Sequence, residues 1–369
     1  MATNHLHEIE ALGQAVWLDN ISRALVEDGE LARLVEEDGL SGVTSNPTIF
    51  EKAMGEGDRY DDAFSEAVSA GVDDPRDVFF RVGEQDIRDA CDILAAVFER
   101  TDGQDGYVSF ELPPDVSDDA QGSIEMAKRL REEIGKDNVL IKVPGTEAGV
   151  TAFEELTAAG VSVNVTLLFA VARYEEIAEA YLRGLERRSE AGEPIDRIAS
   201  VASFFVSRVD SKVDAALEKL DRKDLAGKAG VANAKIAYES FSRIFSGPRW
   251  DALAAKGANV QRPLWASTGT KNPEYPDTLY VDNLIGPDTV NTMPDATMAA
   301  ARDHATATRT VDQGLDEAHA LVDELREIGV RFDDIVSVEL VEEGVAAFAK
   351  SFDSLMETIG EQVRQTAKA

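Results

Sequence analysis

The sequence is poor in the residues that build disulfides and histidine-based sites. It has 369 residues but one cysteine, Cys91, and four histidines. A single cysteine excludes a disulfide framework within the chain. Cys91 lies in a helical apolar pattern, which is typical of a small core residue. The histidines are scattered, with no spacing typical of metal ligands. We therefore expect neither a metal site nor a histidine-based catalytic triad.

Long apolar runs and an excess of positive charge are also absent. No stretch approaches the roughly 18 apolar residues of a membrane span, and the first residues lack the pattern of a secretory signal. The chain has 70 acidic and 37 basic residues and a net charge of −33, which argues against nucleic acid or an anionic membrane as a partner. A few local Lys or Arg side chains can still bind an anionic small molecule. We expect a soluble, cytoplasmic protein, and the sequence leaves its oligomeric state open.

The chain instead alternates short apolar runs with longer amphipathic segments. This alternation predicts βα units and a parallel sheet. The expected strands are Ala15–Asn20, Gly42–Pro47, Tyr107–Leu112, Val139–Pro144, Val161–Phe169, Ala199–Val206, Arg262–Thr268 and Leu279–Ile285. The expected helices include Ile21–Glu37, Val78–Phe98, Ile124–Ile134, Gly149–Leu156, Ala170–Arg187, Ser207–Lys219, Leu315–Ile328 and Val336–Ile359.

Eight strands separated by helices favour an α/β fold of the (β/α)8 TIM-barrel type, with an open doubly wound sheet as the alternative. No G-x-G-x-x-G follows the first expected strand, which weakens a nucleotide-binding version of the open sheet. We expect residues 1–369 to form one barrel domain with extra helices and a C-terminal helical extension over about 295–369.

Polar residues recur near the C-terminal ends of these apolar runs. They are Asp19, Asn46, Glu111, Lys142, Asn164 with Thr166, Ser203 with Arg208, and Ser267 with Lys271. In a barrel the C-terminal strand ends converge on one mouth, where active sites are found. The recurrence therefore predicts a site built from several strands.

Lys142 is the most informative of these residues, because it interrupts the apolar run Val139-Leu140-Ile141-Lys142-Val143. Burial disfavours an ammonium and favours the neutral amine. The neutral amine is the form that attacks a carbonyl to make an imine. The structural alternative is an edge-strand lysine whose ammonium reaches water.

Several motifs resemble the transaldolase family. They are Thr44-Ser45-Asn46-Pro47, the lysine segment Val139–Gly149, the next strand Gly160–Leu167, Trp17-Leu18-Asp19 and Tyr280-Val281-Asp282-Asn283. Their order and spacing agree with the family from about Asp19 to Pro294. The segment Ala266–Pro273 and the chain length are similar to the larger bacterial subgroup rather than to the short fructose-6-phosphate aldolases.

The resemblance implies a barrel of the class I aldolase type with the reactive lysine on the fourth strand. The count of apolar runs independently puts Lys142 on strand four. It also implies transfer of a dihydroxyacetone unit in the pentose phosphate pathway. The donor would be sedoheptulose 7-phosphate or fructose 6-phosphate, and the acceptor glyceraldehyde 3-phosphate or erythrose 4-phosphate. The family needs no cofactor and no metal.

The resemblance also implies catalytic roles at matching positions. Lys142 would form the Schiff base, and Glu111 would act as general acid/base through a water held by Thr166. Asp19 would move the proton of the C4 hydroxyl during cleavage. The structural alternatives are a helix N-cap at Asp19 and a solvated loop carboxylate at Glu111.

The remaining matches concern substrate binding. Asn46, Asn164 and Ser203 match positions that hydrogen-bond dihydroxyacetone, Phe205 matches an aromatic wall, and Arg208 matches a phosphate-binding arginine. The smaller members place a second arginine where this chain has Ser267 and Lys271, which we expect to fill that role. A turn or cap at Asn46 and a core position for Phe205 are the structural alternatives.

Three other functions compete with a transaldolase. A direct aldolase would release dihydroxyacetone without an acceptor sugar. A sugar-phosphate-binding barrel without catalysis would not need Lys142, Glu111 and Asp19 together. A pyridoxal-phosphate enzyme would also use a lysine imine, but it would absorb visible light.

Overall fold

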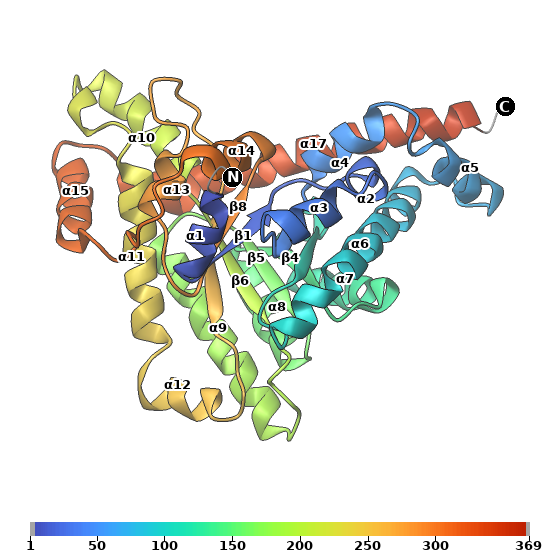
Figure 1. Ribbon diagram of the computed structural model, residues 1–369, viewed down its shortest axis with the longest axis horizontal. Helices are drawn as coiled ribbons and strands as arrows, with labels where there is room; N and C mark the ends of the chain where they lie inside the picture. The colour runs from blue at the N-terminus through green and yellow to red at the C-terminus, as the bar shows by residue number, and fades with distance from the viewer. Residues whose placement is uncertain (1–3, 367–369) are drawn as a thin grey trace.

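A closed barrel of eight parallel strands in chain order forms the centre of the molecule (Figure 1). The computed structural model describes residues 4–366. The strands are β1 (Gln14–Leu18), β2 (Gly42–Thr44), β3 (Tyr107–Glu111), β4 (Val139–Pro144), β5 (Val163–Leu168), β6 (Ser200–Phe205), β7 (Gln261–Ala266) and β8 (Thr289–Met293). The expected (β/α)8 barrel is confirmed, and Lys142 lies on its fourth strand.

Helices precede the barrel, connect its strands and follow them. Up to β6 they are α1 (His5–Ala11), α2 (Arg23–Glu27), α3 (Glu30–Glu37), α4 (Pro47–Gly55), α5 (Asp61–Ser69), α6 (Pro75–Arg100), the 3-10 turn η1 (Pro114–Val116), α7 (Ala120–Ile134), α8 (Glu147–Ala158) and α9 (Val171–Glu190). After β6 they are α10 (Ser207–Lys219), η2 (Lys223–Leu225), α11 (Ala229–Ile244), α12 (Gly247–Ala254), α13 (Leu279–Asn283), α14 (Asp295–His304), α15 (Leu315–Glu327), α16 (Phe332–Asp334), the π-helical turn η3 (Ile335–Glu339) and α17 (Leu340–Thr366).

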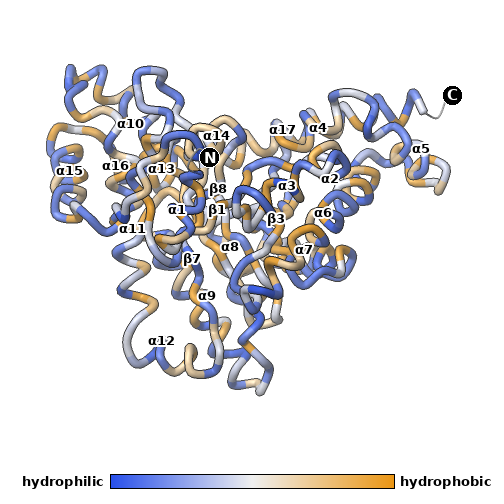
Figure 2. Tube along the Cα trace, viewed as in Figure 1, coloured by the Kyte–Doolittle hydropathy of each residue, from blue (hydrophilic) through white to orange (hydrophobic). Residues whose placement is uncertain are grey.

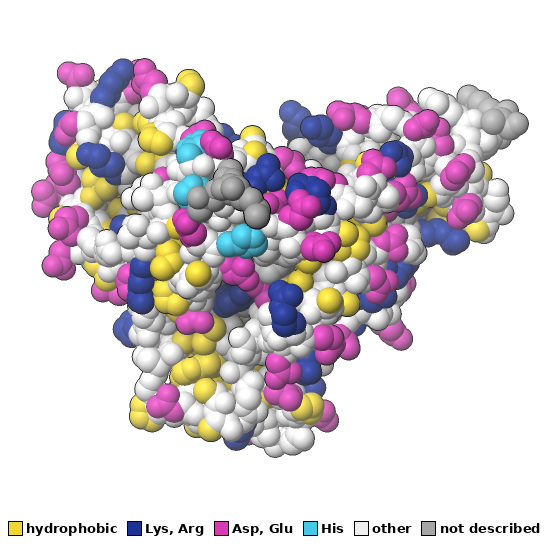
Figure 3. Space-filling model, viewed as in Figure 1, with side chains coloured by type: hydrophobic (Ala, Val, Ile, Leu, Met, Phe, Trp, Pro, Cys, Tyr) yellow, Lys and Arg dark blue, Asp and Glu magenta, His cyan; other side chains and the backbone are white. Residues whose placement is uncertain are grey.

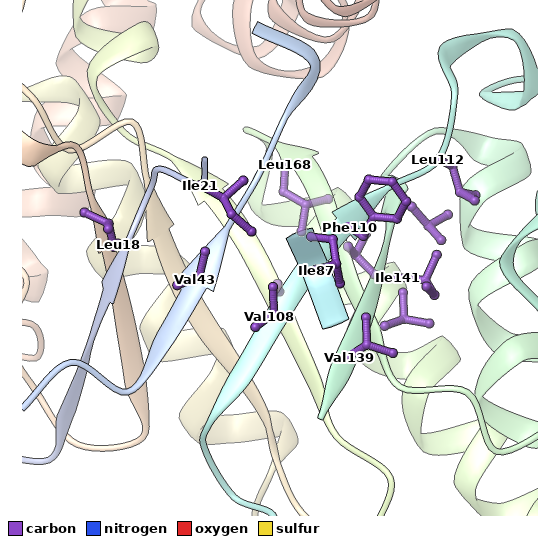
Figure 4. Packing of buried hydrophobic residues seen from close by; sticks show 14 of the residues in the cluster. Leu18, Ile21, Val43, Ile87, Val108, Phe110, Leu112, Val139, Ile141 and Leu168 are labelled. Carbon is purple, nitrogen blue, oxygen red and sulfur yellow. The ribbon is translucent and has the colours of Figure 1, made fainter. Parts of the chain in front are cut away.

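The outward faces of the strands pack against the helices (Figure 4). Val108 pairs with Val139 and Phe110 with Ile141 across β3 and β4, and all four side chains are buried in the larger apolar cluster. Because side chains alternate along a strand, the residues between them point into the barrel. Along the helices around the barrel, apolar and polar residues alternate, as expected of helices with one buried face (Figure 2).

A buried tryptophan fills the barrel interior below the mouth. Trp17 is fully buried, and a Cβ added to Gly42 on the neighbouring strand would lie 2.3 Å from its indole. Glycine is therefore required at position 42 for close approach. The indole Nε1 donates to Asp105 at 2.8 Å, and Asp105 also pairs with Arg262 at 3.3 Å. These contacts fix the lower interior, so the substrate-sized space lies above it.

The expected eighth strand, Leu279–Ile285, is wrong. That run begins with helix α13, in which Tyr280 and Val281 are buried, and β8 follows at Thr289–Met293. A short apolar run does not separate a strand from a buried helix. The true strand contains three polar residues, Thr289, Asn291 and Thr292, and Thr292 faces the barrel interior beside Trp17 of β1.

The expected helix Ile21–Glu37 is two helices, α2 and α3. Gly29 between them has a φ of +77°, a left-handed conformation that ends one helix and precedes the next. Ser207–Lys219 agrees at both ends. The other expected helices agree to within four residues, except that Val336–Ile359 begins within the π-helical turn η3 and α17 continues to Thr366. Cys91 is buried in α6, as predicted.

Helix α17 runs from the barrel along the upper edge of the view in Figure 1 and packs against α4, α5 and α6. It covers one side of the barrel mouth. That the whole chain is one domain with a helical extension after Pro294 stays a prediction. No helix within residues 4–366 combines the length and apolarity that a membrane span needs.

Candidate active site

A cavity of about 260 Å³ lies at the C-terminal ends of the strands. It is lined by Asp19, Thr44, Asn46, Thr48, Ile49, Lys142, Thr166, Ser203, Phe205, Arg208, Ala266, Ser267, Lys271, Thr292, Pro294 and Phe348. Nine of the eleven predicted site residues are in this set. The other two, Glu111 and Asn164, are buried beside it and hydrogen-bond to Lys142 and Ser203 respectively. Polar strand ends that are far apart in the sequence therefore meet at one mouth.

Lys142 lies at the floor of this cavity and is 5% exposed. Its Nζ donates to the carbonyl oxygen of Ser45 at 3.0 Å and to Oε2 of Glu111 at 3.2 Å. The alternative of an edge-strand lysine that reaches water is wrong, because β4 is flanked by strands on both sides. These contacts hold the amine in one place, facing the cavity.

Glu111 ends β3 opposite Lys142 and is 8% exposed. Burial raises the pKa of its carboxyl above the usual glutamate value, and the charge of Lys142 opposes that shift. The alternative of a solvated loop carboxylate is therefore wrong. A carboxyl with a raised pKa next to an amine is suited to exchange a proton with it.

Asp19 follows β1 and faces the cavity. Its Oδ1 accepts a hydrogen bond from the Thr44 hydroxyl at 2.7 Å, and the Thr44 and Thr292 hydroxyls are also 2.7 Å apart. Burial raises the pKa of Asp19, whereas the charge of Lys142 and the Thr44 hydrogen bond lower it. Ser22, not Asp19, caps the following helix, so the N-cap alternative for Asp19 is wrong.

Polar groups from β3, β5 and β6 form a buried chain beside the lysine. Asn164 accepts from the Ser203 hydroxyl at 2.6 Å and donates to Ser109 at 3.0 Å. Thr166 is also buried, and its hydroxyl has no hydrogen-bond partner among residues 4–366. Because buried hydroxyls are almost always partnered, the Thr166 hydroxyl is a candidate contact for a bound molecule or water.

Asn46 has a structural role as well as a place in the cavity. Its Oδ1 accepts from the backbone N–H of Ile49 at 3.0 Å and so caps α4. The cap alternative is therefore correct for this oxygen. The amide nitrogen is the part of Asn46 that is left for a ligand.

The cationic end of the cavity is formed by Arg208 and Lys271. Arg208 lies in the first turn of α10, where a helix N-terminus favours anions. Its guanidinium stacks over Phe205 at 5.1 Å, and burial lowers the pKa of Arg208. Neither Arg208 nor Lys271 forms an ion pair with another residue between 4 and 366.

Ser267 contacts the first residue of the helix that carries Arg208. Its hydroxyl is 2.8 Å from that of Ser207, and its carbonyl accepts from the Ser207 N–H at 3.1 Å. Ser267 has a φ of +56°, a conformation that non-glycine residues adopt rarely. The strained turn after β7 thus places Ser267 at the start of the helix that carries Arg208.

Seven residues of the cavity lining were not predicted: Thr44, Thr48, Ile49, Ala266, Thr292, Pro294 and Phe348. Thr44 stands within the quoted Thr-Ser-Asn-Pro motif, so its position was available. Thr292 was hidden by the wrong eighth strand. Phe348 comes from α17, and no local pattern separates it from the core aromatic residues of the same helix.

The cavity differs in charge from the rest of the molecule. Acidic side chains are spread over the visible surface (Figure 3), in line with the net charge of −33. The cavity lining has three cations, Lys142, Arg208 and Lys271, against one carboxylate, Asp19. Within residues 4–366, no group of three His, Cys, Asp or Glu side chains is arranged to hold a metal ion. The arrangement suits a small anion that carries a carbonyl group.

Comparison with known proteins gives a consistent result. The model of the transaldolase/fructose-6-phosphate aldolase family matches residues 16–359. A protein from Nostoc sp. named transaldolase 2 is 47% identical, over 99% of both chains. A transaldolase from Thiobacillus denitrificans is 46% identical over 97% of this chain and 100% of its own. A transaldolase from Parafrankia sp. is also 46% identical, over 98% and 99% of the two chains.

Proposed function

The chain belongs to the transaldolase/fructose-6-phosphate aldolase family, and from this premise we propose that it is a transaldolase. It transfers a dihydroxyacetone unit from sedoheptulose 7-phosphate or fructose 6-phosphate to glyceraldehyde 3-phosphate or erythrose 4-phosphate, as in the pentose phosphate pathway. The observation that carries the proposal is the buried contact between Lys142 and Glu111 at the floor of a cationic cavity.

The first step is formation of an imine between Lys142 and the donor C2 carbonyl. The neutral amine adds to the carbonyl carbon, and the oxygen must gain protons before it leaves as water. Glu111 lies within hydrogen-bond reach of Nζ, and its raised pKa suits proton transfer in both directions. Thr166, with its unpartnered buried hydroxyl, would hold the water in this exchange.

The second step is cleavage of the C3–C4 bond. Asp19 takes the proton of the C4 hydroxyl, the electron pair of the C3–C4 bond moves toward the iminium nitrogen, and an aldose leaves. The dihydroxyacetone unit stays on Lys142 as an enamine. Its C3 then attacks the carbonyl carbon of the acceptor, and Asp19 returns its proton to the new hydroxyl. Asn46, Asn164 and Ser203 would hold the unit, and Phe205 would form the wall.

The phosphate of donor and acceptor would lie at Arg208 and Lys271. A guanidinium at a helix N-terminus suits a phosphate, and both cations lack an acidic partner among the described residues. Lys271 is a point charge rather than a planar fork, so it would add attraction more than orientation. Ser267 would complete the contact.

The closest alternative in chemistry is direct cleavage of fructose 6-phosphate, which the family description also includes. The two activities differ in whether turnover needs an acceptor. The deciding assay gives the purified protein fructose 6-phosphate with and without erythrose 4-phosphate. Formation of sedoheptulose 7-phosphate only with the acceptor supports transfer, and steady release of free dihydroxyacetone without it supports the aldolase.

Two further alternatives are tested at the same time. A binding barrel without catalysis would consume no donor under either condition. A pyridoxal-phosphate enzyme would show a visible absorption band as purified. We expect turnover in the first test and no band in the second, because the imine of the proposed reaction forms on the substrate itself. A cytoplasmic location remains part of the proposal.

A further inference from the structure

Phe348 brings the C-terminal helix into the candidate active site. It lies on α17, and its ring is 5.9 Å from Nζ of Lys142. It lines the candidate active-site cavity together with Lys142, Thr166 and Phe205. No step proposed above uses this side chain, although it is an apolar group placed over the reacting nitrogen.

Phe348 also lines a second, smaller cavity on the side of Glu111. This cavity has a volume of about 20 Å³, room for about one water molecule. Its other walls are Pro47, Glu111, Leu112, Pro113, Pro114, Ser117, Pro144, Leu167 and Val345. Phe348 therefore lies between the space that a substrate would occupy and the apolar space beside the general acid.

Contacts on both sides fix the helix that carries the ring. The Ser351 hydroxyl is 2.8 Å from that of Thr48 on α4, and Glu339, the last residue of η3 before α17, pairs with Lys212 of α10 at 3.0 Å. Gly344 packs against Leu167 so closely that an added Cβ would lie 2.9 Å from a Leu167 methyl carbon. The position of Phe348 over Lys142 is thus set by packing rather than by a free rotation of the helix.

The backbone of Leu167 gives a second indication that α17 is held firmly against the barrel at this point. It directly follows Thr166 in β5 and has a φ of +59°, where the pairing of β5 with β6 shifts register. Such a backbone costs on the order of 1–3 kcal/mol at a non-glycine residue and persists when surrounding contacts determine it. Here the surrounding contact is α17, one turn before Phe348.

The proposed reaction has an intermediate that must be kept away from water. After C3–C4 cleavage, the enamine on Lys142 has two fates. Its C3 can form a bond to the acceptor carbonyl, which is transfer. Alternatively, C3 takes a proton from water or an acid to give the iminium of dihydroxyacetone. Water then adds to C2, the C2–N bond breaks, and dihydroxyacetone and the protonated lysine result. The second fate needs water at the intermediate, and closed sites suppress such side reactions by excluding it.

We propose that Phe348 is a specificity-determining residue that shields the Lys142 intermediate from water, so that transfer outruns release of dihydroxyacetone. This inference rests on the proposed transaldolase activity. The ring lines the active-site cavity 5.9 Å from Nζ, and the separate space beside Glu111 has room for only about one water.

The test compares three variants with the wild type. Phe348→Ala removes the ring, and Phe348→Leu keeps an apolar but smaller side chain. Phe352→Ala is the matched control, because Phe352 lies one turn later on α17 and packs edge-on against Phe79 at 5.8 Å, away from the cavity. Each protein receives fructose 6-phosphate alone, with free dihydroxyacetone measured, and then fructose 6-phosphate with erythrose 4-phosphate, with sedoheptulose 7-phosphate measured.

We expect the ratio of release to transfer to rise roughly tenfold in Phe348→Ala, which corresponds to a relative barrier change of about 1.4 kcal/mol. Phe348→Leu should give a smaller rise, and Phe352→Ala should leave the ratio at the wild-type value. If Phe348→Ala does not fold, Phe348→Leu decides the question. A wild-type ratio in both folded Phe348 variants, or an equal rise in Phe352→Ala, overturns this inference and leaves the transaldolase proposal intact. Absence of transfer by the wild type overturns the transaldolase proposal instead.

Discussion

Nζ of Lys142 lies 3.2 Å from Oε2 of Glu111, and both side chains are almost completely buried. A proton can therefore pass between the amine and the carboxyl without crossing bulk solvent. Burial raises the pKa of Glu111 while the lysine charge lowers it, so this carboxyl can act both as an acid and as a base. In the proposed reaction this pair would supply both the nucleophile and a proton-transfer group for imine formation.

Lys142 should carry the covalent intermediate. Incubation with fructose 6-phosphate and borohydride should leave a reduced dihydroxyacetone adduct on the peptide that contains Lys142, as mass spectrometry would detect. Lys142→Arg should be inactive, because a guanidinium stays protonated and does not attack a carbonyl. An adduct on a different lysine, or no adduct in active protein, would refute the assignment.

Glu111→Gln should lower kcat with little change in the donor KM. The amide keeps the shape of the side chain but cannot exchange protons, and general acid/base catalysis contributes about 10² to 10⁴ in rate. Steady-state kinetics of the purified variant, checked for wild-type thermal stability, measures the effect. Activity within about twofold of wild type would show that another group supplies the proton, since the lower limit of the expected loss is about 10².

Thr44→Val should change the pH dependence of the reaction through Asp19. The Thr44 hydroxyl donates to Asp19 and lowers the pKa of that carboxyl against the effect of burial. Without the hydroxyl the pKa of Asp19 rises. If ionised Asp19 accepts the C4 proton, the acid limb of the kcat/KM profile must then move to higher pH.

Thr292→Val is the matched control for this change. The Thr292 hydroxyl forms a hydrogen bond with the Thr44 hydroxyl and, among the described residues, none with Asp19. Thr292→Val should therefore move the acid limb less than Thr44→Val does. An acid limb that stays in place in Thr44→Val would mean that Asp19 does not govern it.

Asp210→Asn should alter the pH dependence of stability without touching the cavity lining. Asp210 is buried on α10, and burial raises its pKa to about 6, although the Gly230 N–H that it accepts at 2.7 Å opposes the shift. The unfolded chain releases this proton near pH 4. The stability that comes from the protonated form is therefore complete below about pH 4 and is lost as the pH rises to about 6.

The expected size of this loss is about 3 kcal/mol, from roughly 1.4 kcal/mol per unit of pKa. The asparagine keeps an oxygen that can accept from Gly230 but does not ionise, so this component should vanish from the variant. Urea unfolding of both proteins from about pH 4 to about pH 7 measures it. Parallel pH profiles for wild type and variant would contradict the assignment.

The barrel and its buried lysine could be predicted because each has a signal in short stretches of the sequence. Strand β4 is an apolar run whose only polar residue is Lys142, and its predicted ends agree with the structure. Polar residues at successive strand ends then imply a shared mouth once the strands are parallel. Glu111, Asp19 and Arg208 were found in this way, and the family resemblance added their expected roles.

The parts that could not be predicted depend on packing between distant segments. Strand β8 was missed because Asn291 and Thr292 make it look unlike a buried strand, whereas α13 offers a more apolar run. Phe348 and Phe352 lie on one helix and have the same chemistry, yet one faces the cavity and the other faces Phe79. Only the path of α17 across the mouth separates them.

The last prediction concerns Arg208 and Lys271, which should act on phosphorylated sugars specifically. Arg208→Ala should be the more harmful change, because it removes a charge-assisted fork at the start of α10. A hydrogen bond to a charged group contributes about 1.5–3 kcal/mol, which is roughly a 10- to 150-fold loss in kcat/KM. Lys271→Ala should cost less, since Lys271 is exposed and acts as a point charge.

Lys271→Arg and an uncharged donor complete this test. If Lys271 stands where other family members use arginine, Lys271→Arg should keep most of the activity. Fructose without phosphate should be turned over weakly by the wild type, and neither alanine variant should change that rate much. Equal losses for phosphorylated and non-phosphorylated donors would instead mean that these cations support the fold or the proton balance of Glu111 and Asp19, both of which feel the charge of Arg208. The phosphate would then have to bind elsewhere at the barrel mouth.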